Sequence, residues 1–185
     1  MEIKAVKYDK DKAVFVAKGT TAWYLNSIRR MLINRVPTMA IEDVTFIDNS
    51  SALYDEMVAH RLGMVPLTTD LETYFESPKC KCKGAGCARC SLTITLDKTG
   101  PCTVYAEDLK TKDPKVKPVY PKMPIVKLLA NQSLKIEAVA KLSYGKDHIK
   151  HSPGLMYYQQ YPIFKIKEHK DAKSCVAACP KKILE

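Results

Sequence analysis

The chain has 185 residues, which suits one domain or two small ones, and its 46% share of hydrophobic residues is enough to bury a core. No apolar run approaches the ~20 residues that span a bilayer, and the opening Met-Glu-Ile-Lys-Ala-Val lacks a signal-peptide core, so we expect a cytoplasmic protein without membrane contact. The formal net charge of +10 fits a nucleic-acid partner, an acidic partner or a lysine-rich solvated surface.

The first quarter of the chain predicts a hairpin, a helix and a strand. Residues 2–7 and 12–17 alternate in polarity around a polar turn, which is typical of a β-hairpin. A helix is expected after Gly19-Thr20-Thr21, and Pro37 should end it because proline cannot continue the hydrogen-bond ladder. Residues 40–47 are rich in β-branched side chains and predict a strand.

The next segment predicts a shorter helix followed by two paired strands. Asn49-Ser50-Ser51 can cap this helix, with Leu53, Met57 and Val58 facing a core, and Gly63 stands where a left-handed C-terminal cap belongs. Residues 92–96 alternate as a strand, and residues 102–106 are expected to pair with them across a Thr99-Gly100-Pro101 turn.

The last third predicts a short helix and two more strands. Pro124 fits the first turn of a helix over residues 125–130. Residues 134–140 and 157–166 are strand-like, with Pro162 marking a bulge or an edge. This order of elements favours an α+β fold with a mostly antiparallel sheet.

Four cysteines within eleven residues give the sharpest chemical signal. The spacing C-x-C-x4-C-x2-C, with Gly84 and Gly86 in the intervening loop, can wrap four thiolates around one tetrahedral ion. Flanking lysines and Arg89 favour the thiolate forms. We therefore predict a structural zinc site, and the ligands are Cys80, Cys82, Cys87 and Cys90. The alternatives are a metal-free loop, reduced or disulfide-bonded, and a redox role; Cys102 reads as a small core residue.

A second cysteine pair lies near the end of the chain. Cys175 and Cys179, the latter followed by a proline, match the end of the ferredoxin-type run C-x2-C-x2-C-x3-C-P, whose first two cysteines are absent here. Two ligands cannot hold a cubane cluster, so this segment is interpreted as the remnant of an iron–sulfur site.

Catalytic constellations are absent from the sequence. The four histidines, at 60, 148, 151 and 169, are scattered and are expected to be surface or hydrogen-bonded residues. No P-loop, G-x-G-x-x-G or D-x-D-x-D run occurs. We therefore expect no catalytic residues in this chain.

Two further segments carry a family resemblance. Residues 22–44 look like the signature helix of α-type RNA polymerase subunits, in which N-x-x-R-R is followed by I/V-P and a strand; the matching residues are Asn26, Arg29, Arg30, Val36 and Pro37. Residues 54–67 resemble the D-E-x-x-A-H-R-[IL]-G-[LM]-[IV]-P-L block of the archaeal and eukaryotic branch. The four-cysteine loop stands where the eukaryotic α-like subunit carries zinc, and residues 175–184 are similar to a ferredoxin-type segment of the archaeal α-like subunits.

The resemblance implies a non-catalytic assembly subunit of DNA-directed RNA polymerase. It implies a dimerisation domain at 1–47 and 154–170, an inserted, mostly antiparallel β domain at 48–153, and a ferredoxin-like remnant at 171–185. The dimerisation domain would pair with the small α-like subunit L, and the pair would nucleate assembly of the large catalytic subunits and small assembly subunits. Family members continue into a long C-terminal helix, so we expect a chain truncated at Glu185.

The first helix supplies the candidate partner-binding residues. Its apolar stripe, Leu25, Ile28 and Leu32, can pack on a partner, and Arg29 and Arg30 could pair with carboxylates of a large subunit, because guanidinium suits buried ion pairs. The plain alternative is that both arginines are solvated.

Two other functions fit parts of the sequence. A nucleic-acid-binding zinc module would use the net charge and the cysteine loop, and an electron-transfer protein would use Cys175 and Cys179. The densest lysine stretch, residues 110–122, is broken by three prolines and predicts an extended loop, so we expect no sequence-specific DNA binding.

Overall fold

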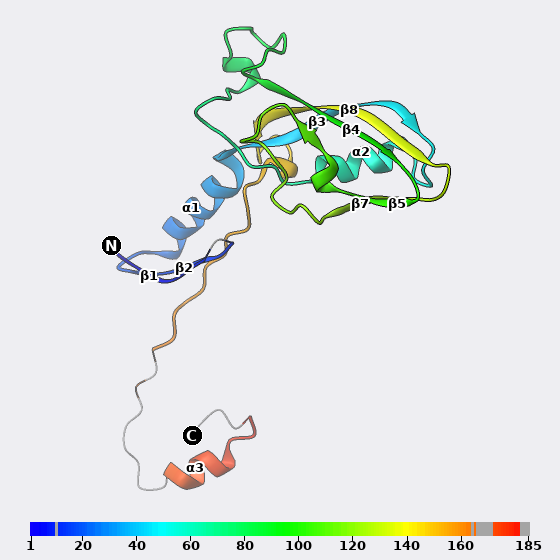
Figure 1. The fold of residues 1–185 in the computed structure, drawn as a ribbon. Coiled ribbons are helices and arrows are strands. Elements are labelled where there is room, and N and C mark those ends of the chain that lie inside the picture. The colour runs from blue at the N-terminus through cyan, green and yellow to red at the C-terminus, as the bar shows by residue number, and fades with distance from the viewer. Residues whose placement is uncertain (10, 164, 166–171, 182–185) are drawn as a thin grey trace. The chain divides into compact units, whose positions relative to one another are not determined.

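The computed structural model describes residues 1–9, 11–163, 165 and 172–181 (Figure 1). Two compact units divide the chain: Met1–Thr20 with Tyr158–Glu185, and Thr21–Tyr157. The helices and strands, in chain order, are β1 (Glu2–Tyr8), β2 (Ala13–Lys18), α1 (Ala22–Arg35), β3 (Pro37–Asn49), α2 (Asp55–Gly63), β4 (Ser91–Thr99), β5 (Cys102–Tyr105), β6 (Lys110–Thr111), β7 (Pro124–Leu128), β8 (Ser133–Tyr144) and α3 (Ala172–Ala178). Three 3₁₀ turns lie at Ser77–Lys79, Ala106–Asp108 and Ile149–His151.

The first unit contains the predicted N-terminal hairpin. β1 and β2 pair antiparallel with one irregularity between Ala5 and Lys7, and the Asp9 amide donates to the Lys12 carbonyl at 2.8 Å. None of the described residues of this hairpin is buried, and Ile3 and Val6 remain 60% and 61% exposed. The hairpin therefore forms as predicted but buries no apolar core of its own.

The second unit is built on a four-stranded antiparallel sheet with the order β3-β8-β4-β6. The central strand β8 alternates, and its buried residues are Leu134, Ile136, Ala138, Ala140 and Leu142. Helix α2 contacts both β3 and β7 and contributes Val58 and Leu62 to the same core (Figure 1). Every strand pairing among the described residues is antiparallel, which confirms the predicted mixed fold with antiparallel sheets.

Two expectations about the middle of the chain were wrong. Residues 124–128 form strand β7 instead of a helix, because Ile125 and Val126 are buried β-branched residues in a segment that pairs with β5. Residues 102–105 pair with this strand and not with 92–96, which are flanked by β8 and β6. A proline at the first position allows a helix or an edge strand, and tertiary packing decides between them.

The caps of α2 also differ from the prediction. The helix begins at Asp55 with Tyr54 as N-cap, while Asn49 accepts hydrogen bonds from Ser51 in a separate turn. Gly63 is the last helical residue and lacks a left-handed backbone, and Met64 follows with φ −89°. The strand expected at 157–166 is absent from the described residues 157–163 and 165, and the remaining positions lie outside the described residues.

Helix α1 ends at Arg35, directly before the extended segment that Pro37 opens, as predicted. Its last turn approaches the end of β8 closely: a Cβ added at Gly145 would lie 2.0 Å from the Ile33 carbonyl oxygen. The Lys146 amide also donates to the Asn34 carbonyl at 3.3 Å. No residue of α1 is buried, and these backbone contacts hold the last turn of the helix beside the end of β8.

A small polar cluster ties β3 to the turn Ile149–His151. His151 is 2% exposed, and its Nδ1 lies 2.9 Å from the Thr38 carbonyl oxygen. The Lys150 ammonium lies 2.6 Å from Glu42 Oε2, and the hydrogen bond from Lys150 holds the pKa of Glu42 below its ordinary value of 4.5. The prediction that the histidines are hydrogen-bonded is confirmed for His151.

The Glu42–Lys150 pair predicts a dependence of stability on pH. A depressed carboxyl pKa stabilises the fold above the unfolded value of 4.5, and this contribution is lost as the pH falls through the folded pKa. We expect Glu42→Gln to be less stable than the parent by about 0.5 kcal/mol at neutral pH, since the pair is partly solvated. Urea unfolding in steps below pH 4.5 should show this difference shrinking to nothing; a constant difference would contradict the assignment.

No helix among the described residues is long and apolar enough to cross a membrane.

Candidate metal centre

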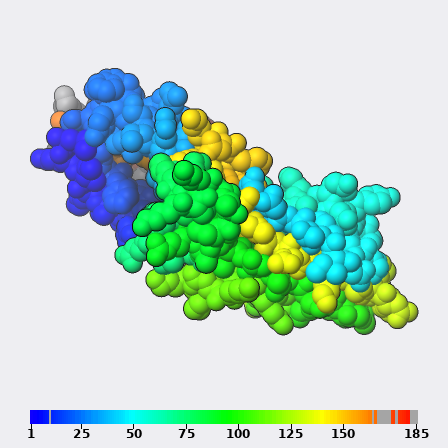
Figure 2. Space-filling model, turned by 90° about the horizontal axis from the view of Figure 1, so that it is seen from above, coloured from blue at the N-terminus to red at the C-terminus, as the bar shows by residue number. Residues whose placement is uncertain are grey.

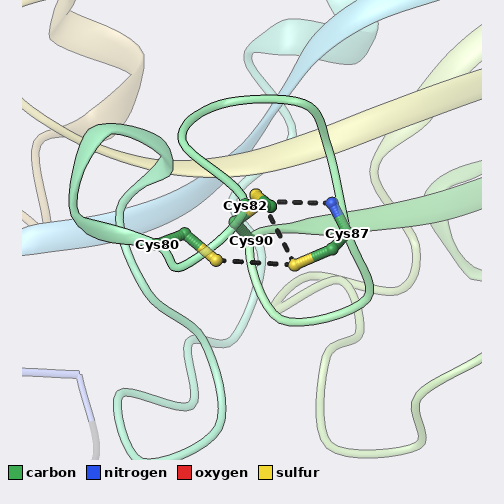
Figure 3. A group of neighbouring side chains, drawn as sticks. All are labelled: Cys80, Cys82, Cys87 and Cys90. Carbon is green, nitrogen blue, oxygen red and sulfur yellow. Dashed lines mark hydrogen bonds between the residues drawn. The ribbon is translucent and has the colours of Figure 1, made fainter.

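The four clustered cysteines bring their sulfur atoms together in one loop (Figure 3). All four Sγ atoms lie within 4.8 Å of one another. The separations are 3.4 Å for Cys80–Cys87, 3.5 Å for Cys82–Cys90 and 3.8 Å for Cys87–Cys90. A tetrahedral zinc with Zn–S bonds of about 2.3 Å holds its sulfurs about 3.8 Å apart. The arrangement therefore fits a tetrahedral ion bound by four thiolates.

The backbone of the loop explains how four side chains converge. Lys83, Gly84 and Gly86 have φ values of 51°, 90° and 81°, in the left-handed region that glycine adopts without strain. Gly84 and Gly86 therefore allow the chain to reverse between the two cysteine pairs. Each cysteine pair lies within a tight turn: the Lys83 amide donates to the Cys80 carbonyl at 2.9 Å, and the Cys90 amide to the Cys87 carbonyl at 2.9 Å.

The environments of the thiols differ. Hydrogen bonding from Cys90 lowers the pKa of the Cys82 thiol to about 6, whereas burial raises the pKa of the Cys90 thiol to about 12. The Cys87 amide also donates to Cys90 Sγ at 3.3 Å, as backbone amides do toward thiolate ligands. Because a metal needs all four sulfurs deprotonated, binding must release protons and strengthen as the pH rises.

The loop is anchored to the sheet on one side and exposed on the other. Cys90 is 1% exposed and directly precedes β4, and the Phe75 amide donates to the Arg89 carbonyl at 2.9 Å. The loop projects beyond the start of β4, and its segment lies on the face toward the viewer in the space-filling view (Figures 1 and 2). Lys81, Lys83 and Arg89 are exposed around it, where their charges offset those of the thiolates.

The chain segment before the loop is held by Glu76. Its carboxylate accepts a hydrogen bond from the Tyr144 hydroxyl and forms an ion pair with Lys79 at 2.9 Å. Burial acts to raise the pKa of Glu76, but the hydrogen bonds from Tyr144 and Lys79 outweigh it and hold the pKa below the ordinary value. Glu76 is therefore a charged anchor at neutral pH, and nothing in the sequence pattern marked it.

The candidate partner-binding residues lie along α1. Leu25, Ile28, Arg29 and Leu32 are half-buried and Arg30 is exposed. The Arg29 guanidinium already bonds to Asn26 Oδ1 at 3.1 and 3.2 Å, so it is oriented along the helix surface.

The candidate partner-binding residues did not include the more exposed apolar residues of α1. Trp23 is 72% exposed and Met31 63%, and Trp23 contacts Tyr24 edge-on with ring centroids 6.2 Å apart. Tyr24, Ile28 and Met31 follow helical spacing, which was the available signal.

The second cysteine pair lies in and directly after helix α3. Cys175 lies within α3 and Cys179 follows it, half-buried. Within the described part of the chain, the only group of three or more metal-ligating side chains is the four-cysteine loop. The iron–sulfur interpretation of Cys175 and Cys179 stays a prediction. Cys102 packs against the core, as expected for a small core residue.

Comparisons with known proteins agree with the resemblance in the sequence. Residues 40–169 match the family model described as RNA polymerase Rpb3/RpoA insert domain. The chain is 41% identical to DNA-directed RNA polymerase subunit Rpo3 of Methanosarcina acetivorans over 186 residues, which cover all of this chain and 70% of that protein. It is 42% identical to the Rpo3 subunit of Pyrococcus furiosus over 168 residues, which cover 91% of this chain and 62% of that protein.

The match to the Methanosarcina acetivorans protein extends over the first helix, the sheet and the cysteine loop together. The chain belongs to the Rpo3 family of archaeal DNA-directed RNA polymerase subunits, the α-like subunits also called D.

Proposed function

We propose that this chain is a non-catalytic assembly subunit, which pairs with the small α-like subunit L and forms the platform on which the large catalytic subunits assemble. The observation that carries the proposal is the exposure of apolar residues on α1. The helix presents Trp23, Tyr24 and Met31 to solvent, and none of its residues is buried. Exposed apolar residues gathered on one helix mark a protein-binding surface.

The proposed domain division is the one that the family resemblance implies. We assign residues 1–47 and 154–170 to dimerisation and residues 48–153 to the insert domain. The insert-domain model matches residues 40–169, which include the whole proposed insert. The grouping of Met1–Thr20 with the segment from Tyr158 supports joining the first and last parts of the chain in one domain. Residues 171–185 are proposed as the ferredoxin-like remnant.

The four-cysteine loop is proposed to hold a structural zinc. Zinc suits four thiolates at tetrahedral separations, and a complete set of protein ligands leaves no open position for a reacting water. Cys80, Cys82, Cys87 and Cys90 would bind the ion, and the lysines around them would balance its charge. The ion would fix the loop and would take no part in nucleotide transfer.

A substitution in the centre of α1 tests the assembly role. Ile28→Asp places a charge in the apolar stripe, and we expect it to weaken binding of purified subunit L by at least about 30-fold, the effect of losing an interface hot spot. Titration calorimetry measures the affinity, and size-exclusion chromatography with light scattering shows whether the heterodimer survives.

Ile149→Asp is the matched control, because Ile149 is an isoleucine that is 63% exposed on another element. It should bind subunit L like the parent. Equal binding by Ile28→Asp, with helix content retained by circular dichroism, would reject α1 as the dimerisation surface.

A further inference from the structure

Tyr144 connects the cysteine loop to the end of the sheet. It is the last residue of β8, and its hydroxyl donates to Glu76. The Lys79 ammonium donates to the same hydroxyl at 3.2 Å and lies 5.8 Å from the centroid of the Tyr144 ring. Lys79 directly precedes Cys80, the first metal ligand. The tyrosine ring is thus held by the residues that lead into the metal loop.

The backbone beyond Tyr144 holds α1. Gly145 is packed against the Ile33 carbonyl so closely that a Cβ would lie 2.0 Å from its oxygen. The Lys146 amide donates to the Asn34 carbonyl at 3.3 Å, and the Asp147 amide donates back to the Tyr144 carbonyl at 2.9 Å. The side chain of Tyr144 therefore contacts the residues that precede the four-cysteine loop. Its backbone begins the turn that packs against the last turn of α1 and hydrogen-bonds to it.

Charge and partial burial strengthen the contacts of Glu76 and Lys79 with Tyr144. The Glu76 side chain is 16% exposed, so its ion pair with Lys79 is shielded on one side. Hydrogen bonds that involve a charged group are roughly twice as strong as neutral ones. Glu76 caps the Ser77–Lys79 turn and Lys79 ends it, so a movement of this turn would disturb the contacts of both residues with Tyr144.

We propose that Tyr144 is a positioning residue, which couples metal occupancy of the four-cysteine loop to the placement of helix α1. With the ion bound, Cys80 is fixed, and through it Lys79 and Glu76 hold the tyrosine ring. The turn after β8 then keeps Gly145 packed against the Ile33 carbonyl and the Lys146 amide bonded to the Asn34 carbonyl. Without the ion the ring loses its support and α1 moves more freely, so the proposal rests on the proposed role of α1 as the partner-binding helix.

Coupling of this kind is reciprocal, which sharpens its consequences. If metal binding favours the placed helix by a given factor, helix placement favours metal binding by the same factor. Loss of the link is therefore expected to lower zinc affinity by about 5- to 10-fold although Tyr144 is not a ligand. A tyrosine that only stabilised the loop locally would change zinc affinity without any effect on α1.

Trp23 gives a direct readout of the helix. It is the only tryptophan of the chain, lies in the first turn of α1 and is 72% exposed. The experiment compares the full chain loaded with Zn²⁺ and stripped by a chelator, using the time-resolved fluorescence anisotropy of Trp23. In the parent, we expect metal removal to increase the amplitude of fast segmental motion. In Tyr144→Phe, we expect the high amplitude in both states, together with the 5- to 10-fold weaker zinc binding in competition with a chromophoric chelator.

Two further variants complete the design. Tyr120→Phe removes a hydroxyl from a tyrosine that is 54% exposed elsewhere and should respond like the parent. Glu76→Gln removes the charge that holds the tyrosine and should behave like Tyr144→Phe, which keeps the test decisive if one variant folds poorly.

Each outcome decides the proposal. An equal response of Trp23 to metal removal in the parent and in both link variants excludes Tyr144 as the connection, and no response in the parent excludes the coupling. These readouts need no partner subunit. Failure of Ile28→Asp to weaken binding of subunit L would therefore remove the partner-binding role of α1 and leave the coupling intact.

Discussion

Cys90→Ser is expected to abolish tight zinc binding and to destabilise the second unit. Cys90 is 1% exposed, directly precedes β4, and its sulfur lies 3.5 and 3.8 Å from those of Cys82 and Cys87. A serine hydroxyl is a poor zinc ligand at neutral pH, and the remaining three thiolates would face one another without a cation. Because binding of a structural ion contributes directly to folding, we expect a loss of at least about 3 kcal/mol and a melting temperature lower by ~10 °C.

Metal analysis after chelator treatment and thermal unfolding check this result. Cys102→Ser is the matched control, since Cys102 is half-buried, lies outside the loop and its thiol donates to the Thr99 carbonyl at 3.6 Å. It should retain one zinc per chain. If Cys90→Ser kept as much zinc as Cys102→Ser, the loop would not be the metal site.

Gly145→Ala is expected to displace α1 from the sheet. The new Cβ would lie 2.0 Å from the Ile33 carbonyl oxygen and 3.1 Å from its carbon, and both are backbone atoms that cannot rotate away. Carbon atoms in contact prefer separations of about 3.5–4.0 Å, so the last turn of the helix must shift by more than an ångström. We expect a cost of about 3 kcal/mol, either as lower stability or as a detached helix.

Urea unfolding shows whether the variant has lost stability. Hydrogen exchange at Asn34 and Arg35 shows whether the helix has detached. Gly154→Ala provides the comparison, because a Cβ there meets nothing within 4 Å. Its stability should stay within about 0.5 kcal/mol of the parent. A similarly small effect of Gly145→Ala would show that α1 tolerates a wider gap at this point.

Local patterns predicted the parts of the fold that depend on local physics. The hairpin, the end of α1 before Pro37 and the convergence of the cysteines all depend on residues that are near one another in sequence. The glycine positions in the metal loop were recognisable for the same reason, since only a short chain reversal can join the two cysteine pairs.

Strand pairing could not be predicted in the same way. β5 follows β4 after a turn, yet its partner is β7, because the burial of Val104 and Val126 outweighs proximity in the chain. The link through Tyr144 was hidden for a similar reason. A tyrosine at the end of an alternating strand looks like an ordinary edge residue until Glu76 and Lys79 are placed beside it.

The pairing of β3 with β8 sets an order of events during synthesis. Pro37 lies opposite Tyr144, so the first strand of the sheet must wait until nearly all of the second unit has left the ribosome. The four cysteines need only a short segment and can close around an ion much earlier, because a short loop costs less entropy to form. The four-cysteine loop can therefore be complete before β8 emerges. β8 is the last strand to join the sheet, and its final residue, Tyr144, then docks on a loop that has already formed.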